Sequence, residues 1–296
     1  MTPSRKRLLL VHNAIAGIKG RSLVEDVVAE LEKSGATVTR AAPGESEMRR
    51  LAETASDHFD ALIAAGGDGT VRALAAALGT QTVPIALIPM GTGNVLAAEV
   101  ALPKKPRDLA HLILTGRVQR IEGARVNGEP FFLMTGAGFD GAAVKALDTP
   151  LKRRIGKAAY TLPGLKAVAA PLPVLDLDID GKAYRANWVV FANGHRYGGP
   201  FTITRKADLR KPGLQAVIIT SSGKLAQLRQ LTLLGLGYLD KDSGVEVIPC
   251  QRATVRSAAP VLVQCDGDFF GETPITVEAG GPAFHMIVPD AYANGA

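Results

Sequence analysis

The sequence holds few of the residues that mark disulfide-bonded, zinc-binding or base-stacking proteins. Its 296 residues include two cysteines, and aromatic residues make up 5% of the chain. Cys250 and Cys265 form no CxxC pair, and the five histidines show no HExxH spacing, so a disulfide framework and a zinc site are not expected. Scarce aromatics also argue against stacking on nucleic-acid bases. We therefore expect two buried thiols in a reducing cytosol and no nucleic-acid partner.

Long apolar runs are also missing. No run reaches the roughly 18 residues that a membrane span requires. Basic residues at 5–7 precede an apolar core of only four residues, against the roughly 7–15 of a signal peptide, so this segment is expected to be a first buried strand. We expect a cytoplasmic location, or a peripheral one on the inner face of the membrane.

Basic residues outnumber acidic ones. Thirty-four Lys and Arg against 28 Asp and Glu give a net charge of +6 and a pI near 9.4. Such a balance favours anionic partners, either nucleotide phosphates or an anionic membrane surface. Basic clusters at 104–107 and 152–157 could dock on that surface, or could form an ordinary solvated face. The length and an apolar content of 47% suit one large globular domain or two moderate ones.

The first 120 residues alternate short apolar runs with helical patterns. The helix over 22–34 should begin with a capping box of Ser22 and Glu25 and should end at Gly35. This alternation predicts an α/β domain with a parallel sheet over residues 1–120. Strands are expected at 8–12, 36–40, 61–65 and 83–88, and helices at 22–34, 45–56, 71–78 and 107–114.

Two glycine-rich turns follow neighbouring strands of this domain. Glycine N–H groups can approach an anion closely, and a helix beginning near Thr70 would add the positive end of its dipole. Ligands of open parallel sheets bind at the carboxyl ends of the strands. Asp68 would there hold Mg²⁺ or touch an acceptor hydroxyl, although the first turn taken alone could be an ordinary tight turn. The two turns comprise Gly66, Gly67, Asp68, Gly69 and Thr70, and then Gly91, Thr92, Gly93 and Asn94.

After residue 120 the pattern changes to β. Asn127-Gly128 between two strand-like runs predicts a hairpin, and the alternation of apolar and acidic residues over 175–180 predicts a sheet with one solvated face. Helical patterns occur near 151–168 and 224–234. We therefore predict a second, larger, mainly antiparallel β domain over 121–296. Its further strands are expected at 184–192, 214–220, 245–248, 261–265, 275–278 and 284–288.

The pair of glycine turns resembles the catalytic domain of the diacylglycerol kinase and sphingosine kinase family, within the superfamily of NAD kinases and phosphofructokinases. Three later segments are similar to that family too, so the resemblance covers nearly the whole chain. It implies ATP and Mg²⁺ as cofactors, a lipid alcohol as substrate, and transfer of the γ-phosphate to diacylglycerol, giving phosphatidic acid. The later segments are Gly136–Asp140, Asn193-Gly194 with Tyr197-Gly198-Gly199, and Asp266-Gly267-Asp268.

The resemblance also implies roles for single residues. Asp266 would deprotonate the lipid hydroxyl with Asp268 nearby, while Asp68 takes that role in the sphingosine-kinase branch. Paired acids could equally hold Mg²⁺ at Asp68 and Asp268, and Asp-Gly by itself favours a hairpin turn. Asp140 would contact the polar head of the acceptor, or would cap a helix beginning near Gly141. The nucleotide would contact both glycine turns, Asp268, and a first turn that contains Asn13 and Lys19.

Several positions depart from the family pattern. Ala14 stands where the family usually has proline, Ala73 where it commonly has glutamate, and Asp268 where it has the longer glutamate. Lys211-Pro212 replaces an acid that in many relatives helps to hold a structural Mg²⁺, so no such site is expected, and Asp208 is read as a turn residue. The changes at Ala73, Lys211 and Asp268 leave open a regulator that binds nucleotide or lipid without catalysis. A kinase for a sphingoid base or another alcohol is a further alternative, because the acceptor pocket would consist of apolar side chains scattered through the β domain.

Overall fold

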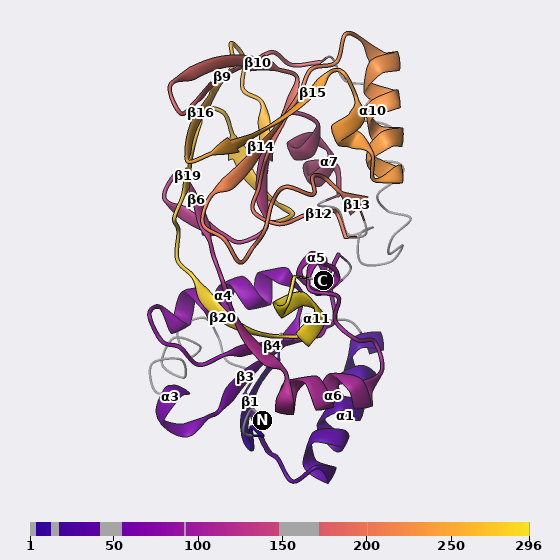
Figure 1. Ribbon diagram of the computed structural model, residues 1–296, viewed down its shortest axis with the longest axis vertical. Helices are drawn as coiled ribbons and strands as arrows, with labels where there is room; N and C mark the ends of the chain where they lie inside the picture. Colours follow the sequence, from indigo (N-terminus) through magenta and orange to yellow (C-terminus); the bar gives the residue numbers. More distant parts are fainter. Residues whose placement is uncertain are drawn as a thin grey trace. The chain divides into compact units, whose positions relative to one another are not determined.

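A computed structural model describes residues 4–12, 18–41, 55–91, 93–147, 172–199 and 201–295. The chain divides into a first unit of Met1–Ile121 with Pro282–Ala296, and a second unit of Glu122–Gly281 (Figure 1). The end of the chain thus belongs to the first unit, whereas the sequence pattern assigned all of residues 121–296 to one β domain. The reason is the pairing of the last strand, described next.

The first unit contains one six-stranded sheet in the order β2-β1-β3-β4-β20-β5. The strands β2, β1, β3 and β4 are parallel, as the alternating pattern predicted. The last strand, β20, pairs parallel with β4 and antiparallel with β5, so it closes this sheet instead of joining the second domain. The strands are β1 (Arg7–His12), β2 (Thr37–Ala41), β3 (Ala61–Gly66), β4 (Ile85–Pro89), β5 (Arg117–Ile121) and β20 (Phe284–Val288).

Helices α1 and α6 pack against each other, and their apolar side chains join those of the sheet in one core (Figure 1). Because α1 begins four residues before Ser22, the predicted capping box is wrong. The predicted stop is confirmed: Gly35 has φ +84°, and its N–H bonds the carbonyl of Glu32 at 2.9 Å. Most of the helix expected at 45–56 lies outside the described residues. The helices are α1 (Ile18–Lys33), α3 (Ala55–His58), α4 (Asp68–Leu78), α5 (Val95–Glu99), α6 (Pro106–Thr115) and α11 (Asp290–Ala293).

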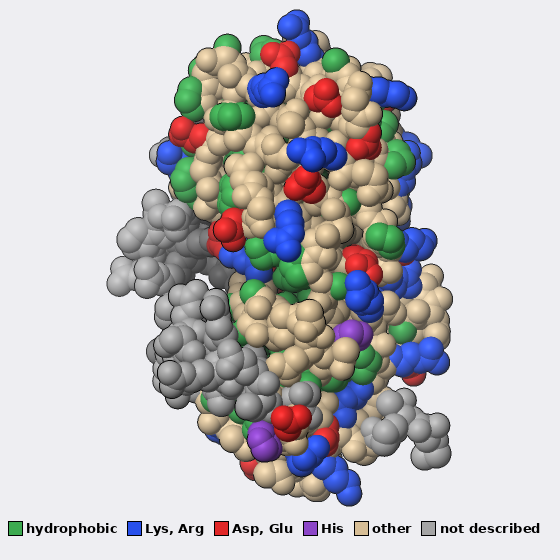
Figure 2. All heavy atoms as spheres, turned by 90° about the vertical axis from the view of Figure 1, so that its left-hand side faces the viewer, with side chains coloured by type: hydrophobic (Ala, Val, Ile, Leu, Met, Phe, Trp, Pro, Cys, Tyr) green, Lys and Arg blue, Asp and Glu red, His purple; other side chains and the backbone are tan. Residues whose placement is uncertain are grey.

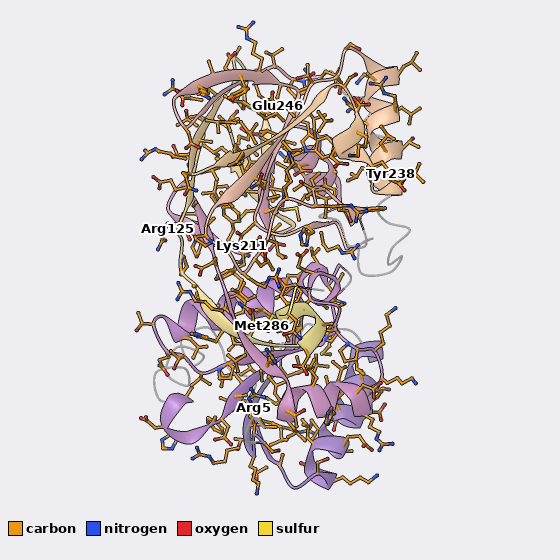
Figure 3. All side chains as sticks on the ribbon, viewed as in Figure 1. Arg5, Arg125, Lys211, Tyr238, Glu246 and Met286 are labelled. Atoms are coloured by element: carbon orange, nitrogen blue, oxygen red, sulfur yellow. The ribbon has the colours of Figure 1, made fainter. Side chains whose placement is uncertain are left out.

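A buried arginine ties the beginning of this unit to the end of α6. The guanidinium of Arg5 donates to the carbonyls of Ile113 and Gly116, at 3.1 and 3.0 Å (Figure 3). These carbonyls lie at a helix end, where backbone acceptors lack intrahelical partners. The buried charge is therefore used for hydrogen bonds that secure the fold.

The second unit consists of two antiparallel six-stranded sheets, in the orders β10-β9-β16-β19-β6-β7 and β15-β14-β11-β8-β17-β18, with a small β12-β13 pair. The predicted antiparallel architecture is confirmed. Helix α7 packs on β17, and α10, predicted from the pattern at 224–234, packs on β13. The bounds are β6 (Ala124–Val126), β7 (Glu129–Phe131), β8 (Met134–Ala137), α7 (Phe139–Leu147), β9 (Leu175–Ile179), β10 (Lys182–Ala186), β11 (Trp188–Ala192), β12 (Arg196–Tyr197), β13 (Phe201–Thr202), β14 (Leu214–Ile219), α10 (Lys224–Leu236), β15 (Val245–Cys250), β16 (Arg252–Arg256), β17 (Leu262–Cys265), β18 (Asp268–Glu272) and β19 (Ile275–Ala279).

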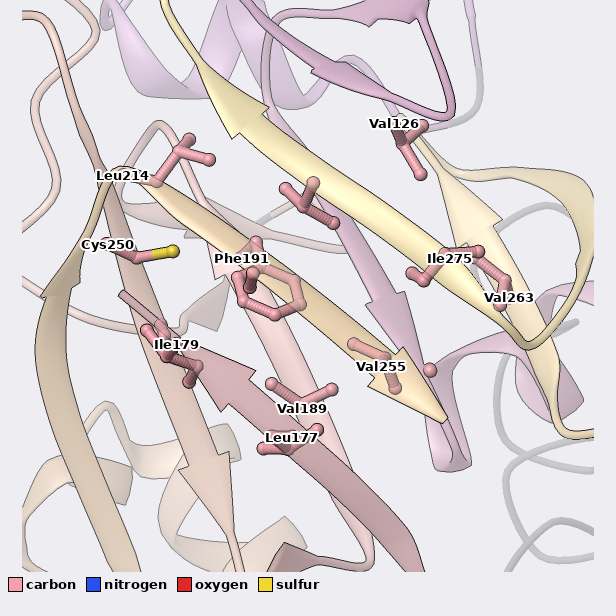
Figure 4. Packing of buried hydrophobic residues seen from close by; sticks show 14 of the residues in the cluster. Val126, Leu177, Ile179, Val189, Phe191, Leu214, Cys250, Val255, Val263 and Ile275 are labelled. Carbon is pink, nitrogen blue, oxygen red and sulfur yellow. The ribbon is translucent and has the colours of Figure 1, made fainter. Parts of the chain in front are cut away.

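The core of the second unit comes from the inner faces of the two sheets. Leu177 and Ile179 on β9 point toward Phe191 on β11, while the acidic residues between them are exposed, as their alternation predicted (Figure 4). Cys250 and Cys265 are buried and unbonded to each other. Burial raises the pKa of the Cys250 thiol to about 12, so this thiol behaves as a small apolar side chain.

Two-residue turns connect strands of the second unit where the sequence predicted them. Asn127 and Gly128 both have positive φ, of 49° and 86°, and join β6 to β7. The helical pattern expected at 151–168 lies outside the described residues. Among the residues that the structure describes, no helix combines the length and the apolar character that crossing a bilayer requires.

Candidate functional site

The two glycine turns meet at the carboxyl ends of β3 and β4. These strands are neighbours in parallel register, and the N–H of Met90 bonds the carbonyl of Gly66 at 2.8 Å. A Cβ placed on Gly91 would lie 3.0 Å from the Cα of Gly67, which is closer than side chains normally tolerate. Glycine at position 91 therefore lets the two backbones approach each other closely.

Asp68 connects the first glycine turn to the helix that follows the second. Its two carboxylate oxygens accept the N–H groups of Val95 and Leu96, both at 2.9 Å. These N–H groups open α5, where backbone donors lack intrahelical partners. The carboxylate thus holds α5 in place against the first glycine turn.

Thr70 and Asn94 do not direct their donors outward. The Thr70 side chain is buried over Gly66, where an added Cβ would overlap its hydroxyl. The Asn94 amide donates to the carbonyl of Gly91 at 2.6 Å, and its Oδ1 is buried with no partner among the described residues. Asn94 therefore offers an acceptor, which suits a sugar hydroxyl or a metal-bound water better than a phosphate.

The other candidate residues for nucleotide binding differ in their exposure. Gly69 is exposed in the first turn of α4, where backbone N–H groups are available to an anion. Gly93 is half-buried. Asn13 and Thr92 lie outside the described residues, and Lys19 belongs to α1 without a described side chain.

The carboxylates do not form a preassembled metal cage. No group of three His, Cys, Asp or Glu residues that could hold a metal ion occurs in the part of the chain that the structure describes. Mg²⁺ is commonly held by one or two carboxylates together with substrate phosphates, so Asp68 in the first unit or Asp268 in the second fits an ion that arrives on a nucleotide. Asp208 is paired instead with Arg210 at 2.7 Å and Lys211 at 3.5 Å.

Asp266 occupies a tight turn and a dense hydrogen-bond site. It joins β17 to β18 together with Gly267, and both residues have positive φ, of 50° and 84°. Its carboxylate accepts three backbone N–H groups that lie far away in the sequence, from Phe132 (3.0 Å), Leu133 (2.8 Å) and Met134 (3.1 Å). The turn therefore aims a fixed carboxylate at the segment that enters β8, while Asp268 is exposed at the start of β18.

Asp140 is buried in the first turn of α7 and does not cap the helix. Its carboxylate accepts hydrogen bonds from the Tyr197 hydroxyl and from Gln264 Nε2, the latter at 3.0 Å. Burial raises its pKa to about 6, because desolvation outweighs the opposing effect of these bonds. Asp140 is therefore a titratable group at neutral to mildly acidic pH, enclosed by polar partners.

Tyr197 belongs to a motif visible in the sequence, but its partner was not predicted, and Gln264 was not predicted as a site residue. No local pattern reveals Gln264, because it lies on a strand and meets Asp140 only through the fold. Asn193 is buried too, and its amide donates to the carbonyls of Glu122 and Phe132, at 2.7 and 2.8 Å. These polar residues stabilise the region around Asp140 and the entry to β8.

A cavity of about 250 Å³ lies within the second unit. Phe139 and Ala142 on α7 contribute to its wall, together with Leu262 on β17, and most of the wall is apolar. Trp188 and Gln227 also line it: the Trp188 indole interacts with the carboxylate of Asp140 and opposes the burial-driven rise of its pKa, while the amide Oε1 of Gln227 is buried without a partner among the described residues. The cavity thus combines an apolar wall with one unused acceptor, as small-molecule sites often do.

Comparisons with known proteins agree with this arrangement. Residues 7–126 match the diacylglycerol kinase catalytic domain, and residues 134–291 match the YegS C-terminal NAD kinase beta sandwich-like domain. A diacylglycerol kinase of Bacillus subtilis is 24% identical over 98% of both chains. An uncharacterized protein of Synechocystis is 27% identical over 77% of this chain, which spans 54% of that protein's length.

A solved structure shows the same fold. The crystal structure of a diacylglycerol kinase from Bacillus anthracis superposes with a TM-score of 0.75, covering 98% of this chain and 99% of that one, at 23% identity. The second-domain match alone covers more than half of the chain. The chain therefore belongs to the family of lipid kinases that joins a diacylglycerol kinase catalytic domain to a YegS C-terminal domain.

Proposed function

We propose that this protein transfers the γ-phosphate of ATP to the hydroxyl of diacylglycerol, giving phosphatidic acid. The observation that carries the proposal is the contact between Gly67 and Gly91, which joins two glycine turns at the carboxyl ends of parallel strands. Backbone N–H groups at such an edge are suited to phosphates. The acceptor is proposed from relatives that are named diacylglycerol kinase.

In the proposed reaction the acceptor oxygen forms a bond to the γ-phosphorus, the bond to the oxygen of ADP breaks, and the hydroxyl proton passes to a base. Mg²⁺ supplies charge neutralisation on the phosphate oxygens when it is bound. Asp68 holds the turns and α5 together beneath the phosphates through its bonds to Val95 and Leu96. Asp266 is proposed as the base, since three accepted N–H groups orient its carboxylate.

The acceptor is proposed to occupy the cavity beside α7. Its apolar wall suits an acyl chain, and the unused Gln227 Oε1 suits a hydroxyl. Asp140 lies in the same helix as Phe139 and Ala142, which line the cavity, and is held by Tyr197. We propose that Asp140 orders this wall, and that it contacts the polar head of the acceptor if Tyr197 moves.

The test is phosphoryl transfer by the full chain with radiolabelled ATP and Mg²⁺. Diacylglycerol, sphingosine and a polyprenol are presented separately in mixed micelles, with Asp68→Ala and lipid-free micelles as controls. Transfer to diacylglycerol alone supports the proposal, and transfer to another alcohol reassigns the acceptor. Nucleotide binding without transfer to any acceptor overturns the kinase proposal in favour of a regulator, in line with the changes at Ala73 and Lys211.

A further inference from the structure

Helix α10 presents an apolar stripe to solvent. Leu225 is 85% exposed, Leu228 52% and Leu236 65%. With Thr232 they stand at positions i, i+3, i+7 and i+11, which share one helix face. Single exposed leucines are common on protein surfaces, but three along one face make a contiguous patch, which marks an interaction site.

The buried side of α10 contains two glutamines, Gln227 and Gln230, together with Leu234. The Ser221 hydroxyl donates to the side-chain oxygen of Gln230 at 2.6 Å, and the amide of Gln230 donates to the Thr220 carbonyl at 3.2 Å. Arg229 forms an ion pair of 2.7 Å with the buried Asp242. Helices on globular proteins normally bury their leucines, as α10 does with Leu234, whereas Leu225, Leu228 and Leu236 stay exposed. The packing of the second unit therefore leaves these three leucines uncovered.

The surroundings of the stripe are apolar and basic. Tyr238, which follows α10, is 56% exposed, and Phe201 on the adjoining β13 is 38% exposed (Figure 3). The helix carries Lys224 and Arg229 and no acidic residue. Arg205 is exposed at the C-terminal end of α10, where its Nη2 would lie 3.9 Å from a Cβ on Gly237. Exposed leucines and aromatic residues beside basic side chains suit an anionic bilayer surface, where burial of apolar area and attraction to lipid charge both favour binding.

We propose that the outer face of α10, with Leu225, Leu228 and Leu236, docks the protein on an anionic lipid bilayer. This inference rests on the proposed function, since a lipid acceptor is drawn from a bilayer. The inner face of the same helix contributes Gln227 to the wall of the 250 Å³ cavity. Docking would therefore place the bilayer one helix width away from the proposed acceptor site.

Other charged surfaces fit a bilayer less well. Lys104, Lys105 and Arg107 are exposed at the start of α6, but no large exposed apolar residue accompanies them. Basic and acidic side chains are mixed on the face of the second unit that carries β9, β16 and β19 (Figure 2). Among the described surfaces, α10 combines an apolar stripe with a local excess of positive charge, which is the pairing that membrane association requires.

The experiment measures binding of the full chain to phosphatidylcholine vesicles with and without phosphatidylglycerol. A double variant, Leu225→Gln and Leu228→Gln, is compared with the unchanged chain. The control variant is Val118→Gln, which removes an apolar side chain that is 43% exposed on β5. We expect the α10 variant to bind anionic vesicles about tenfold more weakly and Val118→Gln to bind normally. Lys224→Gln should lower binding further and reduce its salt dependence.

Equal binding by the α10 variant, or an equal loss in Val118→Gln, would overturn the inference. So would a dimer, seen by size-exclusion chromatography, that the α10 substitutions dissociate, because the stripe would then cover a second copy of the chain. The fluorescence of the single Trp188 reports folding, and Leu225→Gln alone repeats the test at the most exposed position. Turnover of a monomeric short-chain diacylglycerol tests the kinase proposal separately, since it needs no bilayer.

Discussion

Gly91 lies against Gly67, so that a Cβ added to Gly91 would come within 3.0 Å of the Gly67 Cα and 2.8 Å of Asn94 Oδ1. The backbones of the two turns can approach this closely only without a side chain at position 91. The same contact brings glycines from two strand ends together. The nucleotide site that we propose depends on this approach.

Gly91→Ala is expected to lower nucleotide affinity about tenfold or more and to destabilise the fold by roughly 1–3 kcal/mol, because the added methyl forces the turns apart. Isothermal titration with an ATP analogue and thermal unfolding check both effects. Gly235→Ala is the matched control: no atom lies within 4 Å of the added Cβ, and the position is helical, in α10 of the second unit. It should keep nucleotide affinity and gain about 0.5–1 kcal/mol of stability. Equal nucleotide affinity in the two variants would contradict the proposed role of the contact.

Asp68→Ala is expected to abolish phosphoryl transfer and to destabilise the protein by roughly 1–3 kcal/mol, since the N–H groups of Val95 and Leu96 lose their acceptor. Transfer assays and urea unfolding measure the two losses. Asp26→Ala, which removes an exposed carboxylate from α1, should change neither. If Asp68→Ala loses activity while stability is unchanged, the carboxylate acts on the reactants and its bonds to α5 are secondary.

Asp266→Asn separates the base role from the positioning role. Its amide oxygen can still accept the N–H groups of Leu133 and Met134, so a stability loss of only about 1–2 kcal/mol is expected, while a base would be lost completely. The rate of transfer at saturating ATP and lipid is the readout. Near-normal transfer would move the base role to another residue.

In Asp268→Asn the exposed site should tolerate the change, and a raised Mg²⁺ requirement would support a metal role.

Asp140 should make stability depend on pH. The pKa of Asp140 is raised to about 6 in the folded protein, against 3.8 in the unfolded chain. Between these two pH values the folded protein keeps a proton on Asp140 that the unfolded chain has released. The stabilisation is therefore complete below about pH 4 and is lost as pH rises through about 6. A shift of about two units corresponds to roughly 3 kcal/mol at most.

The measurement compares the chain with Asp140→Asn, whose side chain stays neutral. Urea unfolding gives the free energy of unfolding of both proteins at pH 4.5 and pH 7.5. When the change between the two pH values is compared between the proteins, the contributions of the other carboxylates cancel. We expect the unchanged protein to lose more stability than the variant on going to the higher pH. The same change in both proteins would show that Asp140 does not titrate in this range.

Ala142→Leu should fill part of the cavity beside α7. We expect weaker acceptor binding, seen as a raised KM for diacylglycerol, with unchanged affinity for ATP, because the substitution lies in the second unit. Gln227→Met removes the unused acceptor at similar volume and tests whether the cavity recognises a hydroxyl. An unchanged lipid KM in both variants would place the acceptor elsewhere.

Much of the fold could be predicted because hydrophobic periodicity depends on near neighbours. The runs that became β1, β3 and β4 were recognisable from their apolar residues, and Asn127-Gly128 predicted its hairpin. The strand Phe284–Val288 was recognised as a strand but assigned to the wrong sheet. Its alternation says that one face is buried, and gives no information about which partner pairs with it.

The candidate site likewise has a part that the sequence predicts and a part that it does not. The glycine turns were visible as local motifs, whereas the contact between Gly67 and Gly91 follows from the pairing of β3 and β4. The three N–H groups bound by Asp266 and the bond from Gln264 to Asp140 join segments more than a hundred residues apart. No local pattern encodes such pairs, because they form only when the sheets pack.

By itself, then, the sequence determined most of the strands, the four longest described helices and the two glycine turns, since each depends on residues a few positions apart. It missed β16 and β18, and it merged β10 and β11, which lie in different sheets, into one strand over 184–192. Tertiary structure decided which sheet receives the last strand, what Asp68, Asp140 and Asp266 bind, and that Leu225, Leu228 and Leu236 of α10 face solvent. These are long-range outcomes, set by which buried surfaces meet and which polar groups are left to pair inside them.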